Sequence, residues 1–171
     1  MVKNISDVGG QIGDMLVPRG ELCARVIRYD GRVEETVIRN LYTKDGMNRL
    51  AARAVVGATQ SVFYVLAVGS YTSGANAVSL GSVNFGELSR KAAATVVQSK
   101  EYFTLVATWG GAADSITSKT IDAGALCDHA TSGSGIVGGI GQGLSVTLAD
   151  SDFLNLTYRV QVGSHNLAHS T

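Results

Sequence analysis

The chain has 171 residues, which is enough for a single domain that buries a hydrophobic core without disulfides or metals. Its 14 Lys and Arg residues balance 14 Asp and Glu residues, so the formal net charge is zero. This balance argues against binding driven by the phosphates of a nucleic acid, which requires clustered positive charge. Charged residues make up only 16% of the chain, a composition that favours neutral surfaces packed against identical copies.

Residues 1–20 are glycine-rich and lack hydrophobic periodicity, so we expect a flexible N-terminal arm ahead of the folded domain. Its apolar residues Ile12, Met15 and Leu16 are candidate contacts with other subunits. The arm has no hydrophobic segment of the kind found in secretory signals, and no run of residues approaches the roughly 18 apolar positions of a membrane helix. We therefore expect synthesis in the cytoplasm and no membrane partner.

A β-hairpin is predicted over residues 21–40. Asp30 and Gly31 lie between two β-like runs, and both tolerate the positive φ that a two-residue hairpin turn requires. The first run alternates apolar and more exposed residues, although the adjacent pair Val26 and Ile27 obscures which face points inward.

One amphipathic helix is predicted over about residues 43–57. Thr43 can cap its first turn, where Asp45 suits the positive end of the helix dipole. Apolar residues then recur every three or four positions, and Gly57 can end the helix in a left-handed conformation. We expect the apolar face to pack on the core.

The rest of the chain has the pattern of strands and loops. Residues 61–70 are typical of a strand buried on both faces, and an uncharged loop follows them. Apolar residues alternate up to Trp109, which we therefore expect in the core. Further strand-like runs occupy 92–98, 101–109, 143–150 and 153–162, with two short strands and long loops between 110 and 143.

This order of elements favours a mainly β fold, either a β-sandwich or a jelly-roll-like domain. The domain is expected over residues 21–163, between the arm and a C-terminal tail at 164–171.

Gly133, Gly135 and Gly138 have the G-x-G-x-x-G spacing of a dinucleotide-binding loop. That loop requires a buried strand before it and a helix after it. Residues 122–130 hold two acidic residues and a glycine, which predicts a poor buried strand, and the residues after Gly138 alternate as in a strand. The glycines are therefore expected to serve a loop or a bulged strand, and no nucleotide cofactor is predicted.

One grouping of polar residues has the composition of a catalytic site. Asp128 and His129, with Ser132 or Ser134, have the residue types of a hydrolytic triad but lack a nucleophile elbow, so loop roles are favoured. No catalytic residue is therefore predicted.

Two pairs of residues are of types that bind metals. Asp150 and Asp152 could hold a cation through oxygen ligands, but an Asx-turn is the commoner use of such a pair. His165 and His169 have helical spacing without a helical pattern, so no metal is assigned.

Two further polar features have structural explanations. Glu87 can pair with Arg90 or Lys91 in a solvated or interface salt bridge. Cys23 and Cys127 have apolar neighbours, which favours buried free thiols, although the spacing permits a disulfide.

The order of these features resembles that of small structural proteins of tailed bacteriophages. The likeness spans about residues 21–163 and includes an N-L-x-T-x-x-G start of the helix, an L-A-x-G strand, an E-x-x-R element and a closing L-T-Y strand. The matching residues are Asn40, Leu41, Thr43, Gly46, Leu66, Ala67, Gly69, Glu87, Arg90, Thr157 and Tyr158. The chain departs from the pattern in "IDAGALCDHATSG", where a more apolar turn is expected.

The resemblance implies a non-enzymatic component of the virion, either a capsid decoration protein or a part of the tail or its appendages. Its partners would be copies of itself and other virion proteins such as a major capsid or tail protein. Contacts are expected from residues 1–20, from the loops at 69–82 and 110–143, and from Tyr71, Glu87 and Arg90.

Two other functions are compatible with the sequence. One is a carbohydrate-binding adhesin-like module in which Trp109 or Tyr71 stacks on a sugar, although the pattern places Trp109 in the core. The other is a small hydrolase using Asp128, His129 and a loop serine.

Overall fold

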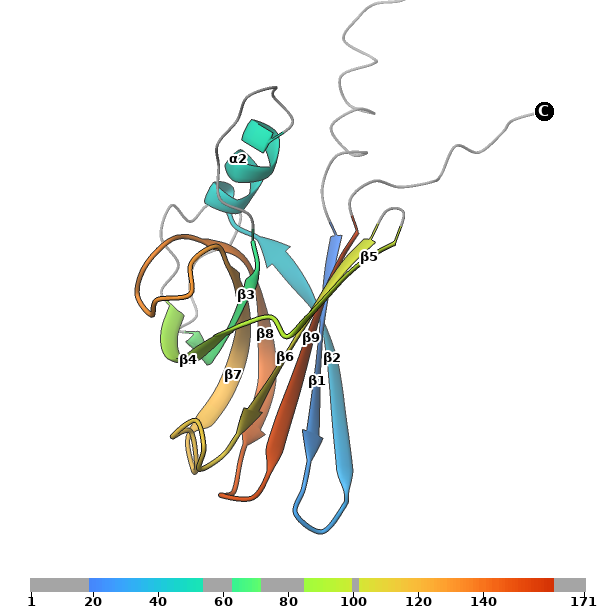
Figure 1. The fold of residues 1–171 in the computed structure, drawn as a ribbon, viewed down its shortest axis with the longest axis vertical. Coiled ribbons are helices and arrows are strands. Elements are labelled where there is room, and N and C mark those ends of the chain that lie inside the picture. Colours follow the sequence, from blue (N-terminus) through green and yellow to red (C-terminus); the bar gives the residue numbers. More distant parts are fainter. Residues whose placement is uncertain (1–18, 54–62, 72–84, 100–101, 162–171) are drawn as a thin grey trace, which may run out of the picture.

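The computed structural model describes residues 19–53, 63–71, 85–99 and 102–161, and Figure 1 shows their fold. The chain is mainly β, with one short helix in the described ranges. In chain order the elements are β1 (Arg19–Ile27), β2 (Val33–Tyr42), α2 (Lys44–Arg53), β3 (Val65–Tyr71), β4 (Phe85–Ala92), β5 (Thr95–Ser99), β6 (Tyr102–Gly110), β7 (Thr120–Cys127), β8 (Val137–Thr147) and β9 (Phe153–Gln161). Within the described ranges no helix is long and apolar enough to cross a membrane.

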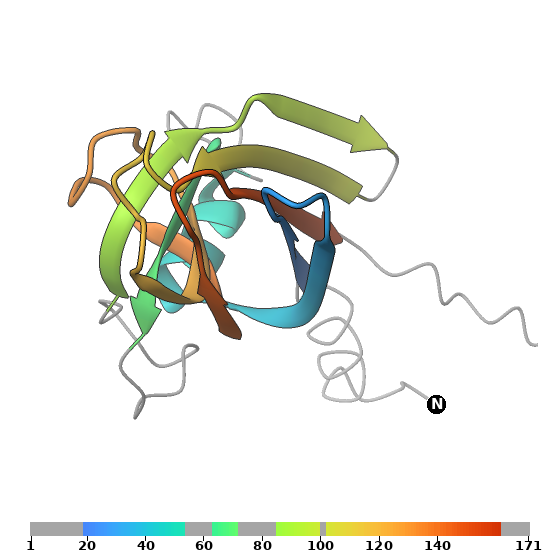
Figure 2. The ribbon, with the colours of Figure 1, turned by 90° about the horizontal axis from the view of Figure 1, so that it is seen from below.

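The strands form a β-sandwich, which confirms the predicted fold class. Hydrogen bonding follows the order β4-β3-β7-β8-β2-β1-β9-β6-β5, and neighbouring strands are antiparallel. The series folds over on itself, so that β4, β3, β7 and β8 form one layer and β2, β1, β9, β6 and β5 form the other (Figure 2). The layers are joined by a short ladder in which residues 40–42 pair with residues 139–141.

A corner between β4 and β5 connects the layers a second time. The Ala93 N–H donates to the Tyr64 carbonyl beside β3 (2.9 Å), whereas the Ala94 N–H donates to the Val106 carbonyl in β6 (2.8 Å). Two successive residues therefore bond to opposite layers, as happens where a strand changes sheets at the corner of a sandwich. The chain turns this corner with two small side chains.

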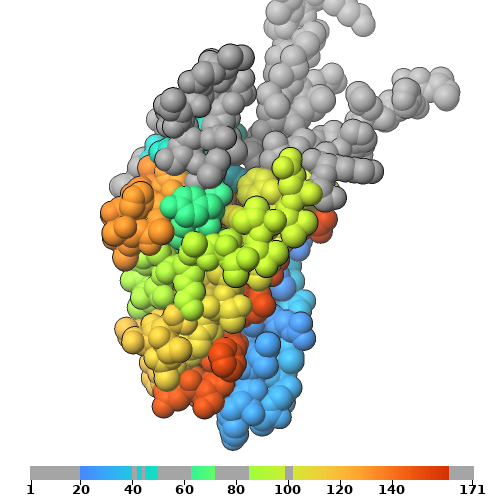
Figure 3. Space-filling view, in the orientation of Figure 1, coloured from blue at the N-terminus to red at the C-terminus, as the bar shows by residue number. Residues whose placement is uncertain are grey.

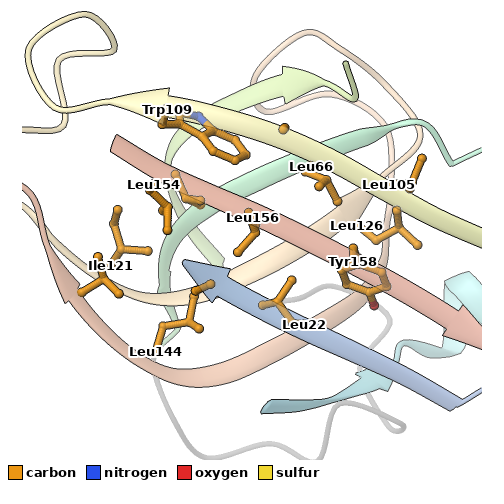
Figure 4. Packing of buried hydrophobic residues seen from close by; sticks show 14 of the residues in the cluster. Leu22, Leu66, Leu105, Trp109, Ile121, Leu126, Leu144, Leu154, Leu156 and Tyr158 are labelled. Carbon is orange, nitrogen blue, oxygen red and sulfur yellow. The ribbon is translucent and has the colours of Figure 1, made fainter. Parts of the chain in front are cut away.

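The hydrophobic core lies between the layers and is built from alternate residues of their strands (Figure 4). Trp109 and Tyr158 are fully buried, as are the leucines that surround them in the same cluster. The Trp109 ring is accommodated because its Nε1–H donates to Ser89 Oγ (3.1 Å). Burying one large apolar side chain is worth about 1.5–3 kcal/mol, so this cluster is the main source of stability.

The first hairpin forms as predicted, but its turn is longer than expected. Arg28 N–H donates to the Arg32 carbonyl (2.8 Å) and Gly31 N–H donates to the Arg28 carbonyl (2.9 Å), which leaves three residues in the loop. Only Gly31, at φ 86°, has a positive φ, while Asp30 does not. The predicted two-residue turn is therefore wrong, and a three-residue loop that ends in a left-handed glycine takes its place.

Helix α2 begins where the sequence predicts, with Thr43 as its cap. The Gly46 N–H donates to Thr43 Oγ1 (2.9 Å) and the Met47 N–H donates to the Thr43 carbonyl (2.9 Å). The Thr43 N–H donates in turn to the Gly138 carbonyl (3.0 Å), which ties the start of the helix to β8. The predicted end at Gly57 lies outside the described residues.

The prediction of a poor strand at residues 122–130 is wrong, because β7 is a central strand of its layer. The five residues between the two aspartates are buried, Asp128 just after the strand is buried as well, and Asp122 near its start is half-buried. Asp122 Oδ1 accepts the Tyr71 N–H (2.8 Å), and Asp128 forms an ion pair with Arg49 (2.9 Å). Each charge is thus compensated at an end of the strand, which leaves an uncharged stretch for the core.

The glycine-rich run has the structural role that its sequence context predicts. Gly133 and Gly135 have positive φ values, 72° and 73°, in the loop between β7 and β8. Strand β8 follows at Val137, where the sheet register shifts, and no helix follows the glycines. A Cβ at Gly138 would lie 2.4 Å from the Phe63 ring, so this glycine permits close packing.

Candidate interaction surface

An apolar row crosses three strands on the outer face of the five-stranded layer. Ile27 of β1 lies directly opposite Val33 of β2 on one side and Phe153 of β9 on the other. These side chains remain 36%, 48% and 50% exposed, and Tyr29 in the adjoining loop is 78% exposed. We call these four residues the apolar tip, since they lie at the end of the sandwich where β1 turns into β2 (Figures 1 and 3).

The loop that carries Tyr29 of the apolar tip is held in place by Arg28. Its guanidinium donates to both oxygens of Glu34 (3.0 and 2.6 Å) and to the Asp152 carboxylate (2.8 Å). It also donates to the Thr147 carbonyl (2.8 Å). One cation thus joins β2 and the end of β8 to the turn before β9.

Asp152 completes this support from the other side. Only 2% of it is exposed, and its carboxylate accepts the Ala149 N–H (2.9 Å) and the Tyr29 N–H (3.1 Å) as well as the Arg28 bond. The pKa of Asp152 is lowered below its usual 3.8, mainly by the hydrogen bond from the Ala149 N–H and next by the one from Arg28. Because the ionised carboxylate anchors the loop, the apolar tip is a preorganised surface at neutral pH.

Charged rows of mixed sign, three arginines and two glutamates, lie beside the apolar tip on the same outer face. Glu21 faces Arg39 on one neighbouring strand and Arg159 on the other, and Arg25 faces Glu35. All five residues are exposed. This face therefore has no strong potential of either sign, and the burial of apolar area would be its main means of binding a partner.

The interaction residues predicted from sequence do not coincide with the apolar tip. Ile12, Met15 and Leu16 lie outside the described residues. Tyr71 is half-buried at the end of β3, packed beside buried residues of β7 and β8. The expected contact loop at 69–82 is described only up to Tyr71, and the one at 110–143 contains the buried strand β7.

Glu87 and Arg90 form the predicted ion pair, but the pair is internal. Their side chains are only 11% and 5% exposed. Arg90 donates to the His129 carbonyl (2.7 Å) and to the Ser134 carbonyl (2.9 Å). Burial would raise the pKa of Glu87, but hydrogen bonds from Arg90 and Ser132 outweigh it and lower that pKa. In this structure the pair braces the loop between β7 and β8.

The residues weighed as a hydrolytic triad have separate structural partners. Asp128 pairs with Arg49, and its Oδ1 accepts the Ile136 N–H (2.7 Å). His129 is exposed, and its Nδ1 accepts the Thr131 N–H (3.1 Å). The aspartate does not orient the histidine, so this geometry lacks the relation on which a triad depends.

The candidate metal and sugar sites from the sequence are not supported in the described residues. Asp152 supports the turn before β9 by accepting the N–H of Ala149, three residues earlier, rather than through the predicted Asx-turn, and Asp150 is exposed beside it. His165 and His169 lie outside the described residues, and within the described ones no three His, Cys, Asp or Glu side chains gather as a metal site. Trp109 is fully buried, so it cannot stack on a sugar.

The two cysteines are free thiols with different exposure. Cys127 is fully buried, and burial raises its pKa to about 12. Cys23 lies half-buried on the outer face of β1, so the prediction of a buried thiol is wrong for it. Its pKa is raised by partial burial first and by Glu35 second.

We expect native protein at pH 8 to be alkylated at Cys23 while Cys127 stays unmodified. With a pKa near 12, only about one Cys127 in ten thousand is ionised at that pH, and the thiol has no access to reagent. Intact mass after iodoacetamide treatment should show one adduct in the native state and two after unfolding in guanidinium. Native labelling of Cys127 would contradict its burial.

The apolar tip was missed by the sequence analysis, although a signal for it existed. In β9 the buried residues are Leu154, Leu156, Tyr158 and Val160, so Phe153 falls on the outward phase. Ile27 likewise follows the buried Val26 and must point outward. Apolar residues at outward-facing positions of two strands indicate an exposed apolar patch once those strands are known to be neighbours.

The fold defines an antiparallel β-sandwich with one short helix in the described part of the chain. No protein-family model, no curated protein and no solved structure matches the chain.

Proposed function

We propose that the chain is a non-enzymatic structural subunit of a tailed-bacteriophage virion, a capsid decoration or tail component. It is made in the host cytoplasm and stabilises the particle through repeated contacts with copies of itself and with another virion protein. The assignment to a virion rests on the resemblance in the order of sequence features. The contact mechanism rests on one structural observation, the preorganised apolar tip.

Three features of the described residues support a contact function. The apolar tip exposes two aromatic side chains, the type that contributes most strongly when protein surfaces meet. Arg28 and Asp152 fix its backbone, which lowers the entropy cost of binding. The charged pair Glu87 and Arg90 and the acidic Asp128 are engaged in bracing loops.

A glycan-binding module of a tail appendage is the second proposal. The Tyr29 ring is 78% exposed on a fixed loop, which makes it a possible platform for a sugar ring. A glycan array probed with the purified chain separates the two proposals, because saturable binding that Tyr29→Ala abolishes would favour the adhesin.

We expect the chain to band with phage particles purified from the source bacterium on a density gradient, detected by mass spectrometry. Phage that carry Phe153→Ser and Tyr29→Ser should retain less than a tenth of the wild-type amount of the chain, because these aromatics would be buried in the contact. The matched control is Val37→Ser, at a valine that is 52% exposed on the same layer.

The thermal unfolding of each variant should match that of the wild type, since the substituted side chains are exposed. A chain found only outside the particles would contradict the virion role. Full retention of the tip variants on particles would contradict the apolar tip as the contact.

A further inference from the structure

Strand β5 is the edge of the five-stranded layer and has no partner on its outer side among the described residues. It pairs only with β6, from Thr95 opposite Val106 to Ser99 opposite Tyr102. After the corner at residues 93–94 it departs from β4, as Figure 2 shows at the end of the layer. Its outer N–H and C=O groups are therefore available to another strand.

Both faces of β5 are exposed and apolar at its centre. Val96 lies opposite Leu105 and so points to the core side, yet it is 61% exposed, whereas Leu105 is buried. Val97 lies opposite Thr104 on the outer side and is 51% exposed. The opposite layer does not cover this strand, so its two valines remain in contact with water.

The edge also lacks the devices that usually prevent edge-to-edge pairing. No charged residue and no proline occurs from Ala92 to Ser99. The edge to compare with it is that of β2, where residues 33–39 have no partner on the side away from β1 within the described ranges. That edge carries Glu34, Glu35 and Arg39, which disfavour pairing, whereas β5 carries nothing comparable.

We propose that β5 pairs with β5 of a second copy of this chain, antiparallel about a two-fold axis. Full overlap of the two strands places Val97, the central residue of β5, opposite Val97 of the second copy. The five-stranded layers of the two copies then form one continuous sheet, and their outer faces lie on the same side of it. The inference rests on the proposed function, in which copies of the chain contact one another.

Self-pairing is the assignment that the charges favour. In a two-fold pair the residue on the axis faces its own copy, so a charge at the centre of the edge would repel itself and disfavour self-pairing. β5 is uncharged, and the whole chain has a formal net charge of zero, so neither local nor overall repulsion opposes the pair. Pairing also buries part of the exposed apolar area of Val96 and Val97, which is favourable.

The test is the molar mass of the full chain by sedimentation equilibrium over a hundredfold range of concentration. The wild type should reach twice the 17.8 kDa of one chain. Val97→Lys and Val97→Glu should each raise the dissociation constant at least tenfold, since like charges then face each other about 5 Å apart. An equimolar mixture of the two variants should restore the dimer, because lysine then faces glutamate.

Val37→Lys is the control, since Val37 is equally exposed but lies on β2. Hydrogen exchange provides a second measurement, in which amides of residues 95–99 should become protected as concentration rises while residues 33–37 stay unchanged. If either Val97 variant unfolds at a lower temperature, Thr95→Lys replaces it, because full overlap places that exposed residue opposite Ser99.

A wild type that remains monomeric over the whole range overturns the inference, as does a dimer that both Val97 variants leave intact. A dimer weakened by Val37→Lys instead would assign the contact to β2 and would also overturn it. The proposed function fails separately: a monomeric chain that still bands with phage particles removes only the β5 contact, and a dimer that never bands with them removes only the virion role.

Discussion

Replacing Gly46 by alanine should destabilise the protein, even though alanine is the better helix former. Gly46 is buried in the first turn of α2, against the backbone of β8. A Cβ at this position would lie 2.0 Å from the Gly138 carbonyl oxygen and 2.7 Å from its Cα. The Phe63 ring also packs closely on Gly138, 2.4 Å from where a Cβ there would stand, which restricts any shift of this glycine. Only a displacement of the helix relieves the clash.

The expected loss is about 2 kcal/mol in the free energy of unfolding. Alanine gains about 1 kcal/mol in helix propensity, whereas overpacking against an immobile backbone costs about 3 kcal/mol. Guanidinium denaturation followed by circular dichroism measures the difference. Asn48→Ala, on an exposed position of the same helix, is the control and should be neutral or stabilising. A Gly46→Ala chain more stable than the wild type would contradict the packing of α2 on β8.

The sequence predicts well those features of the fold that depend on local periodicity. Alternation in β6 and β9 places Leu105, Ala107 and Trp109, then Leu154 and Leu156, in the core, and all five are buried. A period of two fixes which face of a strand is apolar, and one apolar face suffices to predict a sandwich layer. The mainly β class follows from these patterns alone.

The errors arise where a distant residue decides the outcome. β7 looks too polar for a core strand until Arg49, far earlier in the chain, is seen to compensate Asp128. Its Gly124 is small because side chains of Leu22 and Leu156 press on it, at 2.7 and 3.1 Å from where a Cβ would stand. No local pattern records such contacts, since they depend on which strands become neighbours.

The apolar tip could not be predicted from the sequence for the same reason. Ile27, Val33 and Phe153 form one patch only because β2, β1 and β9 are consecutive in the sheet. The β5 edge likewise becomes visible only when the strand order is known, although the absence of charge from Ala92 to Ser99 is plain in the sequence. The strand order thus determines which apolar residues, distant in sequence, lie together on one surface.

Asp152→Ala should cost about 3 kcal/mol of stability at pH 7, because it removes the acceptor of the two N–H groups and the guanidinium that fix the hairpin loop. Arg28 keeps Glu34 and the Thr147 carbonyl, so the loss is less than that of an isolated buried charge. Urea denaturation gives the free energy of unfolding. Asp150→Ala, at an exposed position of the same turn, should change it by less than about 0.5 kcal/mol.

The same carboxylate predicts a pH dependence with a definite sign. Its pKa in the folded chain is lowered from 3.8, so the unfolded chain takes up the proton first as the pH falls. The stability that Asp152 contributes is therefore complete well above pH 3.8 and declines as the pH falls through 3.8 toward the lower folded pKa. Arg28 lowers the pKa of Glu34 in the same direction, which makes the whole support of the apolar tip sensitive to acid.

Asp152→Asn separates this contribution from that of the other acidic groups. Asparagine is nearly isosteric but does not ionise between pH 2 and 7, so the variant should lose stability at neutral pH and show a shallower decline below pH 5. The difference between the two chains should consequently shrink as the pH falls, because a protonated aspartic acid and an asparagine both hold the loop without charge. A difference that stayed constant from pH 7 to pH 2 would show that the ionised form of Asp152 does not support the hairpin loop.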